Sequence, residues 1–211
     1  MPIRLGIVDD HMISREVVKK CCIEIGDFEV VLEAATGADA VAGIIRTKPD
    51  AILLDLGLPD FDGIEVVQRI RKSGAHPRTI VLSAYCTPYS VYRLEQLGIE
   101  GFIHKPSQST TILRGALSAL REGRTFFSTI FLETQNDRRA DPGAFDKLLT
   151  EEQLSILSLA AKHRSDREIA ARLSIPQSDI ETQLGLIMRK LNVRSRAELI
   201  SIAEVLGFIM S

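Results

Sequence analysis

The feature that most constrains the fold of this chain is a fivefold alternation of short apolar runs and helical patterns over residues 1–122. The apolar runs, at 3–8, 29–34, 51–54, 79–83 and 101–104, are rich in Ile, Val and Leu. Short strands that are apolar throughout are typical of a parallel sheet covered on both faces. The segments between them, 14–25, 38–47, 63–72, 90–97 and 110–122, have a helical pattern. We therefore predict a doubly wound α/β domain with five parallel strands and right-handed crossovers.

Charged and polar residues stand where several of these predicted strands end. Asp9 and Asp10 follow the first strand, Asp55 the third and Lys105 the fifth, and Ser83 ends the fourth. Each alone is typical of a turn, a cap or a solvated surface, but in an open parallel sheet this shared edge is where ligands bind. Carboxylate oxygens suit Mg²⁺ and an ammonium suits a phosphate, so the set predicts transfer of a phosphoryl group to Asp55 beside a Mg²⁺ ion. We expect Asp10 and Asp55 to bind the cation directly and Asp9 to hold a bound water.

Four neighbouring residues receive plainer interpretations. His11 follows the acidic pair, but we interpret it as a residue that does not bind the cation. Asp60 and Asp62 are expected to shape the turn before the third helix and to cap that helix. Tyr85, two residues beyond the end of the fourth strand, is expected to overhang the site.

Composition excludes some classes of protein. The chain has 211 residues, 45% of them hydrophobic, and a net charge of −2, which indicates a globular protein and gives no support for a general polyanion binder. Its three cysteines contain no C-x-x-C motif and are expected to be free thiols in a reducing cytoplasm. No apolar run approaches the roughly 18 residues of a membrane span, and the first carboxylates come too early for a signal peptide, so we expect no membrane partner.

The pattern changes near Gly123. Residues 123–147 are interpreted as an exposed, mobile linker, although the apolar residues at 126–132 are expected to dock on a domain. Residues 148–211 then predict a small all-helical domain, with Ser/Thr-x-x-Glu/Gln capping boxes that begin at Thr150, Ser165 and Ser195. The predicted helices are 151–162, 166–173, 177–191 and 196–206, and the tight connection around Pro176 is typical of a helix-turn-helix.

These residues resemble a known family. Residues 1–122 resemble a response-regulator receiver domain, which has a flavodoxin-like fold, through Val8-Asp9-Asp10-His11, Asp55-Leu56-Gly57-Leu58-Pro59, Ser83-Ala84 and Gly101-Phe102-Ile103-His104-Lys105-Pro106. Residues 149–200 resemble the LuxR-type helix-turn-helix through Leu149-Thr150, Ile169-Ala170, Leu173 and Lys190-Leu191.

The resemblance implies a role for several residues. Asp55 would be the phosphoacceptor, Asp9, Asp10 and the Gly57 carbonyl would serve the Mg²⁺ site, and Ser83 and Phe102 would be the switch pair. A sensor histidine kinase would be the phosphoryl donor, and double-stranded DNA the target of the output domain. A homodimer on phosphorylation is a further implied partner.

The output domain departs from the family at its recognition helix. Pro176, Asp179, Glu181 and Gln183 stand where the family has Ser, Thr, Lys and His. Carboxylates here would repel DNA phosphates, although Glu181 can also cap its own helix from Ser178. The expected DNA contacts are Gln177, Thr182, Gln183, Arg189, Lys190, Arg194 and Arg196.

Three functions follow from these expectations. The leading one is a phosphorylation-controlled transcription regulator, and the second is a phosphorylated interaction protein whose helical domain no longer binds DNA. An enzyme acting through an aspartyl intermediate is disfavoured, because Gly57 rather than an acid or base stands two residues after Asp55.

Overall fold

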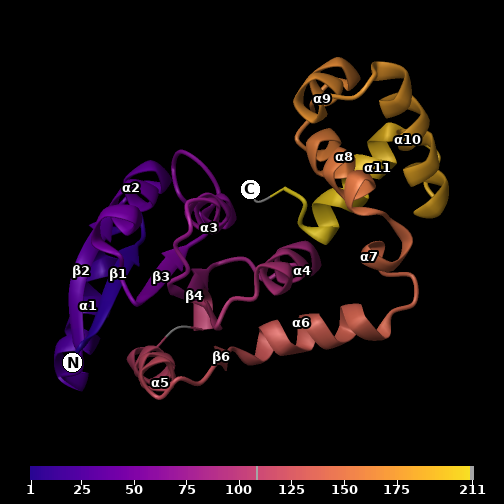
Figure 1. The fold of residues 1–211 in the computed structure, drawn as a ribbon. Coiled ribbons are helices and arrows are strands. Elements are labelled where there is room, and N and C mark those ends of the chain that lie inside the picture. Colours follow the sequence, from indigo (N-terminus) through magenta and orange to yellow (C-terminus); the bar gives the residue numbers. More distant parts are fainter. Residues whose placement is uncertain (108, 210–211) are drawn as a thin grey trace. The chain divides into compact units, whose positions relative to one another are not determined.

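The computed structural model describes residues 1–107 and 109–209 (Figure 1). The chain divides into two compact units: Met1–Cys86 with Arg93–Glu133, and Thr87–Tyr92 with Thr134–Ser211. Because these units are not contiguous along the chain, they do not decide the domain bounds predicted from the sequence, which stay a prediction.

The first unit is built on a parallel sheet with the strand order β2-β1-β3-β4-β5-β6. The doubly wound α/β fold is confirmed, but the sheet has six strands where five were predicted. The sixth has only two residues, too few for any periodicity, and pairs with the start of the fifth. The strands are β1 Ile3–Val8, β2 Phe28–Ala34, β3 Ala51–Asp55, β4 Arg78–Ser83, β5 Gly101–His104 and β6 Phe126–Phe127.

Helices cover both faces of the sheet, because alternate residues of each strand point to opposite layers. Leu53 joins Val18 of α1 (Met12–Ile25) and Leu117 of α5 (Thr110–Arg121) in one buried cluster. On the other face, Leu54 joins residues of α2 (Gly37–Thr47) and of α3 (Gly63–Lys72), Val67 among them. The helix α4 (Pro88–Leu97) and the short 3₁₀ helix η1 (Lys105–Ser107) complete the α/β part of the chain. Burial on both faces explains why the strands are apolar throughout.

The loop that follows β3 is fastened at two places. Asp62 caps α3 as predicted, accepting a hydrogen bond from the backbone N–H of Ile64 at 2.9 Å. Asp60 was expected to act there too, but its carboxylate accepts from the backbone N–H groups of Gly37 and Ala38 (2.7 and 2.9 Å) at the start of α2. Desolvation raises the pKa of Asp60, but these backbone hydrogen bonds outweigh it and hold the pKa below its ordinary value. The loop is therefore tied to a helix more than twenty residues earlier in the chain.

The segment interpreted as a linker contains secondary structure. Helix α6 spans Thr129–Ala140 and the one-turn helix α7 spans Phe145–Leu148, and neither helix was predicted from the sequence. That the segment links two domains stays a prediction. The polar composition of α6 concealed that helix, since it has no continuous apolar stripe. Docking of its first turn was predicted correctly: Phe131 is 1% exposed, and its ring centroid lies 4.9 Å from that of Phe127 and 5.0 Å from that of Phe102.

The second unit contains the helices α8 (Glu151–Ala161), α9 (Asp166–Leu173), α10 (Gln177–Lys190) and α11 (Arg196–Leu206). Their bounds agree with the prediction to within one residue. The capping boxes at Thr150 and Ser165 are both complete, whereas Ser195 caps α11 through the backbone N–H of Glu198 alone. The inner faces of the helices meet in one core that includes Ile156, Ile169, Ile180, Ile187 and Leu199.

Among the residues that the structure describes, no helix combines the length and the apolar character needed to cross a membrane.

Candidate functional site

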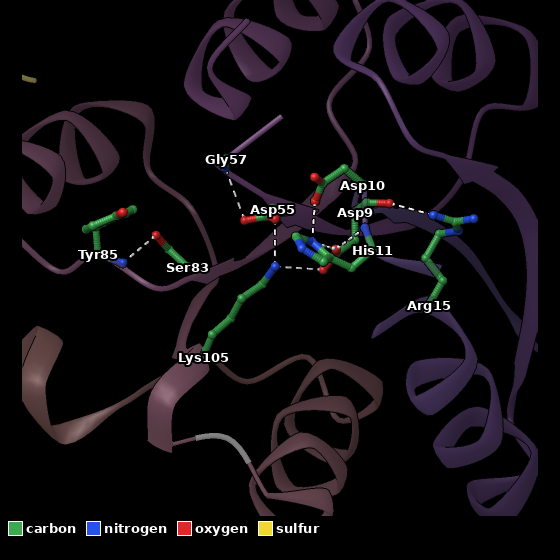
Figure 2. Close-up of polar contacts among 9 residues, drawn as sticks. All are labelled: Asp9, Asp10, His11, Arg15, Asp55, Gly57, Ser83, Tyr85 and Lys105. Atoms are coloured by element: carbon green, nitrogen blue, oxygen red, sulfur yellow. Dashed lines mark hydrogen bonds and ion pairs between the residues drawn. The ribbon is translucent and has the colours of Figure 1, made fainter. Parts of the chain in front are cut away.

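Four charged side chains gather at the C-terminal edge of the sheet, as the sequence predicts. Asp9 follows β1, Asp55 is the last residue of β3, and Lys105 follows β5 (Figure 2). Asp9 and Asp55 are almost fully buried, at 1% and 5% exposure, whereas the side chain of Asp10 is 32% exposed. Parallel strands bring their carboxyl ends to one edge, and this is why residues far apart in the sequence meet here.

Lys105 joins the two buried acids. Its Nζ lies 2.6 Å from Asp55 Oδ2 and 2.8 Å from Asp9 Oδ2. Burial lowers the pKa of the Lys105 ammonium, but its interactions with the carboxylates of Asp55 and Asp9 outweigh burial, so that the pKa is raised above its ordinary value. The lysine is therefore a permanent cation at neutral pH, placed where an acceptor oxygen of a phosphoryl group would need one.

Arg15 and His11 both contact the loop after β1, which carries Asp9 and Asp10. Arg15 donates from Nη1 to the backbone carbonyl of Asp9 at 2.8 Å. The backbone N–H of His11 donates to Asp9 Oδ1 at 2.9 Å, and the imidazole Nδ1 of His11 lies 2.5 Å from Asp10 Oδ1. The sequence analysis missed Arg15, whose position one turn into α1 gave no signal, and it assigned His11 no part in the site.

Gly57 and Ser83 flank Asp55. The backbone N–H of Gly57 donates to Asp55 Oδ1 at 3.1 Å, so the two carboxylate oxygens of Asp55 have different partners. Ser83 is 1% exposed and its Oγ accepts from the backbone N–H of Tyr85 at 3.1 Å. Figure 2 shows Tyr85 on the far side of Ser83 from Asp55, so the expectation that its ring overhangs Asp55 was wrong. Phe102, the other expected switch residue, is fully buried beneath Phe131.

The donor set fits a divalent cation. The carboxylates of Asp9, Asp10 and Asp55 bring three negative charges, and Lys105 returns one positive charge, which leaves two uncompensated. Asp9 Oδ2 is buried and makes no well-directed hydrogen bond, so its compensation is the ammonium at 2.8 Å. Hard oxygen donors with this excess of charge are what Mg²⁺ requires. Ligand atoms of these acids and of His11 all lie within 4.8 Å of one another.

The expected DNA contacts of the second unit have several intramolecular partners. Lys190 Nζ donates to Gln153 Oε1 (2.9 Å), and Gln153 Nε2 donates to Gln183 Oε1 (2.9 Å). Arg196 pairs with Asp166 and donates from Nη2 to the carbonyl of Arg164.

The start of α10 lacks a side-chain cap. Thr182 Oγ1 donates to the carbonyl of Ser178, and Gln177 Nε2 donates to Glu181. Ser178 lies inside the helix rather than at its N-cap, which is Pro176, so the expected cap by Ser178 and Glu181 is absent. Within the part of the chain that the structure describes, the side chains of Arg189 and Arg194 make no hydrogen bond or ion pair.

Comparisons with known proteins agree on both halves of the chain. The family described as response regulator receiver domain matches residues 5–116, and the family described as bacterial regulatory proteins, luxR family, matches residues 147–203. The response regulator protein VraR of Staphylococcus epidermidis is 31% identical over 198 residues, which is 94% of each chain. VraR of Staphylococcus saprophyticus is 29% identical over the same share of each chain.

A solved structure resembles the whole chain. RcsB from Salmonella enterica serovar Typhimurium, bound to the promoter P1flhDC in the presence of the phosphomimetic BeF₃⁻, matches with a TM-score of 0.68 and 25% identity. The match covers 95% of this chain and 97% of that one. The charged edge of the sheet, the helical second unit and these relatives agree, and the chain belongs to the response regulators that join a receiver domain to a LuxR-type helix-turn-helix domain.

Proposed function

We propose that this response regulator accepts a phosphoryl group on Asp55 with the help of Mg²⁺ and controls transcription by binding DNA. The observation that carries the proposal is the Lys105 ammonium, which lies 2.6 Å from Asp55 and 2.8 Å from Asp9 at the ligand edge of the sheet. The donor would be a sensor histidine kinase in the cytoplasm, and the free thiols of the chain are in keeping with that compartment.

In the proposed transfer, a carboxylate oxygen of Asp55 attacks the phosphorus of a phosphohistidine. A P–O bond to Asp55 forms while the P–N bond breaks, and the imidazole leaves with the electron pair and takes up a proton. Mg²⁺ would offset the negative charge of the moving group, held by Asp9, Asp10, Asp55 and the Gly57 carbonyl. Lys105 would exchange its contact with Asp55 for one with a phosphoryl oxygen.

Modification at Asp55 would then be read by the switch pair. A phosphoryl group adds charge and acceptor oxygens beside Ser83, whose hydroxyl at present accepts from the backbone N–H of Tyr85. If Ser83 turns to the phosphate, the family resemblance implies that Phe102 fills the space that Ser83 vacates. The charge of the phosphoryl group would in this way shift the equilibrium between two conformations of the switch pair. A homodimer is the expected outcome.

The experiment has two steps. The full-length chain, and an Asp55→Ala variant as control, would be treated with acetyl phosphate and Mg²⁺. Their intact masses would then be measured by mass spectrometry. The same proteins, with and without BeF₃⁻, would then be titrated with random-sequence duplex DNA at two salt concentrations. We expect phosphorylation of the unaltered chain alone, and DNA affinity that rises with BeF₃⁻ and falls with salt. A chain that takes no phosphoryl group would refute the proposal at its first step.

A second candidate function rests on a specific observation in the output domain. Asp179 and Glu181 stand on the first turns of α10, while Arg196 is paired with Asp166 of the same domain. Fewer cations are therefore left for phosphates than the sequence indicates. If BeF₃⁻ changes the oligomeric size in the second step but no DNA binds in any state, the helical domain serves a protein partner.

A further inference from the structure

The position of His11 at the start of α1 does not explain the direction of its side chain. It is the N-cap residue of α1, a position that favours Ser, Thr, Asp or Asn, whose side chains can bond the first free backbone N–H groups. The His11 side chain makes no such bond. Its imidazole instead turns to the acidic edge of the sheet, where Figure 2 shows it beside Asp9 and Asp10.

The imidazole lies within reach of the carboxylates that would hold the ion. Nδ1 lies 2.5 Å from Asp10 Oδ1 and 3.5 Å from Asp9 Oδ1. Neighbouring ligand atoms around an octahedral cation with bonds of about 2.1 Å are about 3.0 Å apart. The two measured separations lie on either side of this value, so a shift of about half an ångström in each would fit an ion between them. The side chain of His11 is 71% exposed, which leaves it free to make that shift.

We propose that His11 is a nitrogen ligand of the cation site, and that the site therefore favours a first-row transition cation such as Mn²⁺ over Mg²⁺. Mg²⁺ binds oxygen ligands and loses its water reluctantly, whereas the divalent ions of the first transition row accept imidazole nitrogen more readily. Mn²⁺ is the member of that row that also suits carboxylate ligands. A site with carboxylates alone would discriminate little between Mg²⁺ and Mn²⁺. This inference rests on the proposed function, because the carboxylates of the phosphorylation site supply the rest of the ligands.

The experiment measures cation binding directly, without phosphorylation or DNA. Full-length chain would be titrated by calorimetry with MgCl₂ and with MnCl₂ at one pH above the titration range of histidine. The variants are His11→Ala and His11→Asn, of which the second restores a good N-cap and so guards the fold of α1. His76→Ala is the matched control, since His76 precedes β4 at the opposite edge of the sheet. Pulsed electron paramagnetic resonance of the Mn²⁺ complex would report whether a nitrogen is bound to the ion.

We expect both His11 variants to weaken Mn²⁺ binding by about tenfold or more and to leave Mg²⁺ binding nearly unchanged. The ¹⁴N coupling of the Mn²⁺ complex should be present in the unaltered chain and in His76→Ala, and absent from both His11 variants. Equal Mn²⁺ affinity in all four proteins, with no nitrogen coupling, would overturn the inference and leave His11 as a residue that orients Asp10. If neither cation binds the unaltered chain, the inference fails together with the Mg²⁺ part of the proposed function, and the mass measurement on Asp55 then decides what remains of that function.

Discussion

A methyl group added at Gly63 would strike the backbone of Asp55. Gly63 is the first residue of α3, and a Cβ built there lies 2.3 Å from the carbonyl oxygen of Asp55 and 2.9 Å from the Cα of Leu56. Both atoms belong to the backbone, which cannot swing aside as a side chain can. The backbone N–H of Gly63 also donates to the carbonyl of Leu56 at 3.0 Å, which holds the helix start against the strand end. Gly63→Ala therefore forces the end of β3 and the start of α3 apart.

The size of the effect follows from two opposing contributions. Alanine is favoured over glycine in a helix by about 1 kcal/mol. Overpacking a tight site costs about 1–3 kcal/mol, and a contact this short with rigid backbone belongs at the upper end. We expect a net loss of about 1–2 kcal/mol in the free energy of unfolding of the receiver domain. The Asp55 carbonyl must retreat by several tenths of an ångström, which should slow phosphorylation by acetyl phosphate about tenfold.

A second glycine supplies the matched control. Gly185 lies inside α10, and a Cβ built there has no atom within 4 Å. Gly185→Ala should therefore stabilise the output domain by about 1 kcal/mol. Hydrogen exchange of the full-length chain, read by mass spectrometry, resolves β3 with α3 from α10 in one experiment. If Gly63→Ala protects β3 to the extent that Gly185→Ala protects α10, the reasoning from the short backbone contact is refuted.

Three further predictions concern other parts of the chain. Burial raises the pKa of the Cys22 thiol to about 12. Because the thiol of the unfolded chain ionises near pH 9, it leaves the free energy of unfolding unchanged below that pH and lowers it as the pH rises towards 12. Urea unfolding of Cys22→Ala should not show this decrease, and a decrease as large as in the unaltered chain would show another cause. Phe131→Ala should cost about 3–5 kcal/mol of receiver stability, and a loss below about 1 kcal/mol, measured by hydrogen exchange, would contradict its packing in the core. Arg189→Ala should reduce the salt dependence of DNA binding by about one unit, whereas Arg196→Ala, which breaks the pair with Asp166, should lower stability and leave the salt dependence intact; equal effects on DNA binding would contradict this division.

The receiver site was predictable because its geometry follows from topology alone. Asp9, Asp55 and Lys105 each stand directly after an apolar run, and parallel strands bring such positions to one edge. The run lengths, together with the capping residues, placed most element ends to within one or two residues. No long-range side-chain contact had to be known in advance.

The missed features all depend on partners that are distant in sequence. Asp60 binds the start of α2 rather than that of α3, because its carboxylate accepts from the backbone N–H groups of Gly37 and Ala38. The polar helix α6 has little periodicity, and the ring of Phe131 packs against Phe102, more than twenty residues earlier in the chain. The sequence pattern of such segments is weak, since their stability comes from tertiary contacts rather than from local preference.

The function of the receiver domain is also easier to predict from sequence than that of the output domain, because the role of a DNA-contacting residue depends on its partners in the fold. The sheet topology alone places a carboxylate that ends a strand, but a DNA-contacting cation must also be free. Lys190 is bonded to Gln153 and Arg196 to Asp166, so these side chains fasten helices of their own domain. Gln153 is neutral and leaves the charge of Lys190 in place, so the charge left for phosphates falls to Arg189, Lys190 and Arg194, against Asp179 and Glu181 on the first turns of α10. Non-specific affinity scales with the number of phosphates neutralised, so this domain should bind DNA weakly as a single copy. We therefore expect tight DNA binding to require two paired output domains, and under the proposed function the phosphorylation of Asp55 would provide the pair.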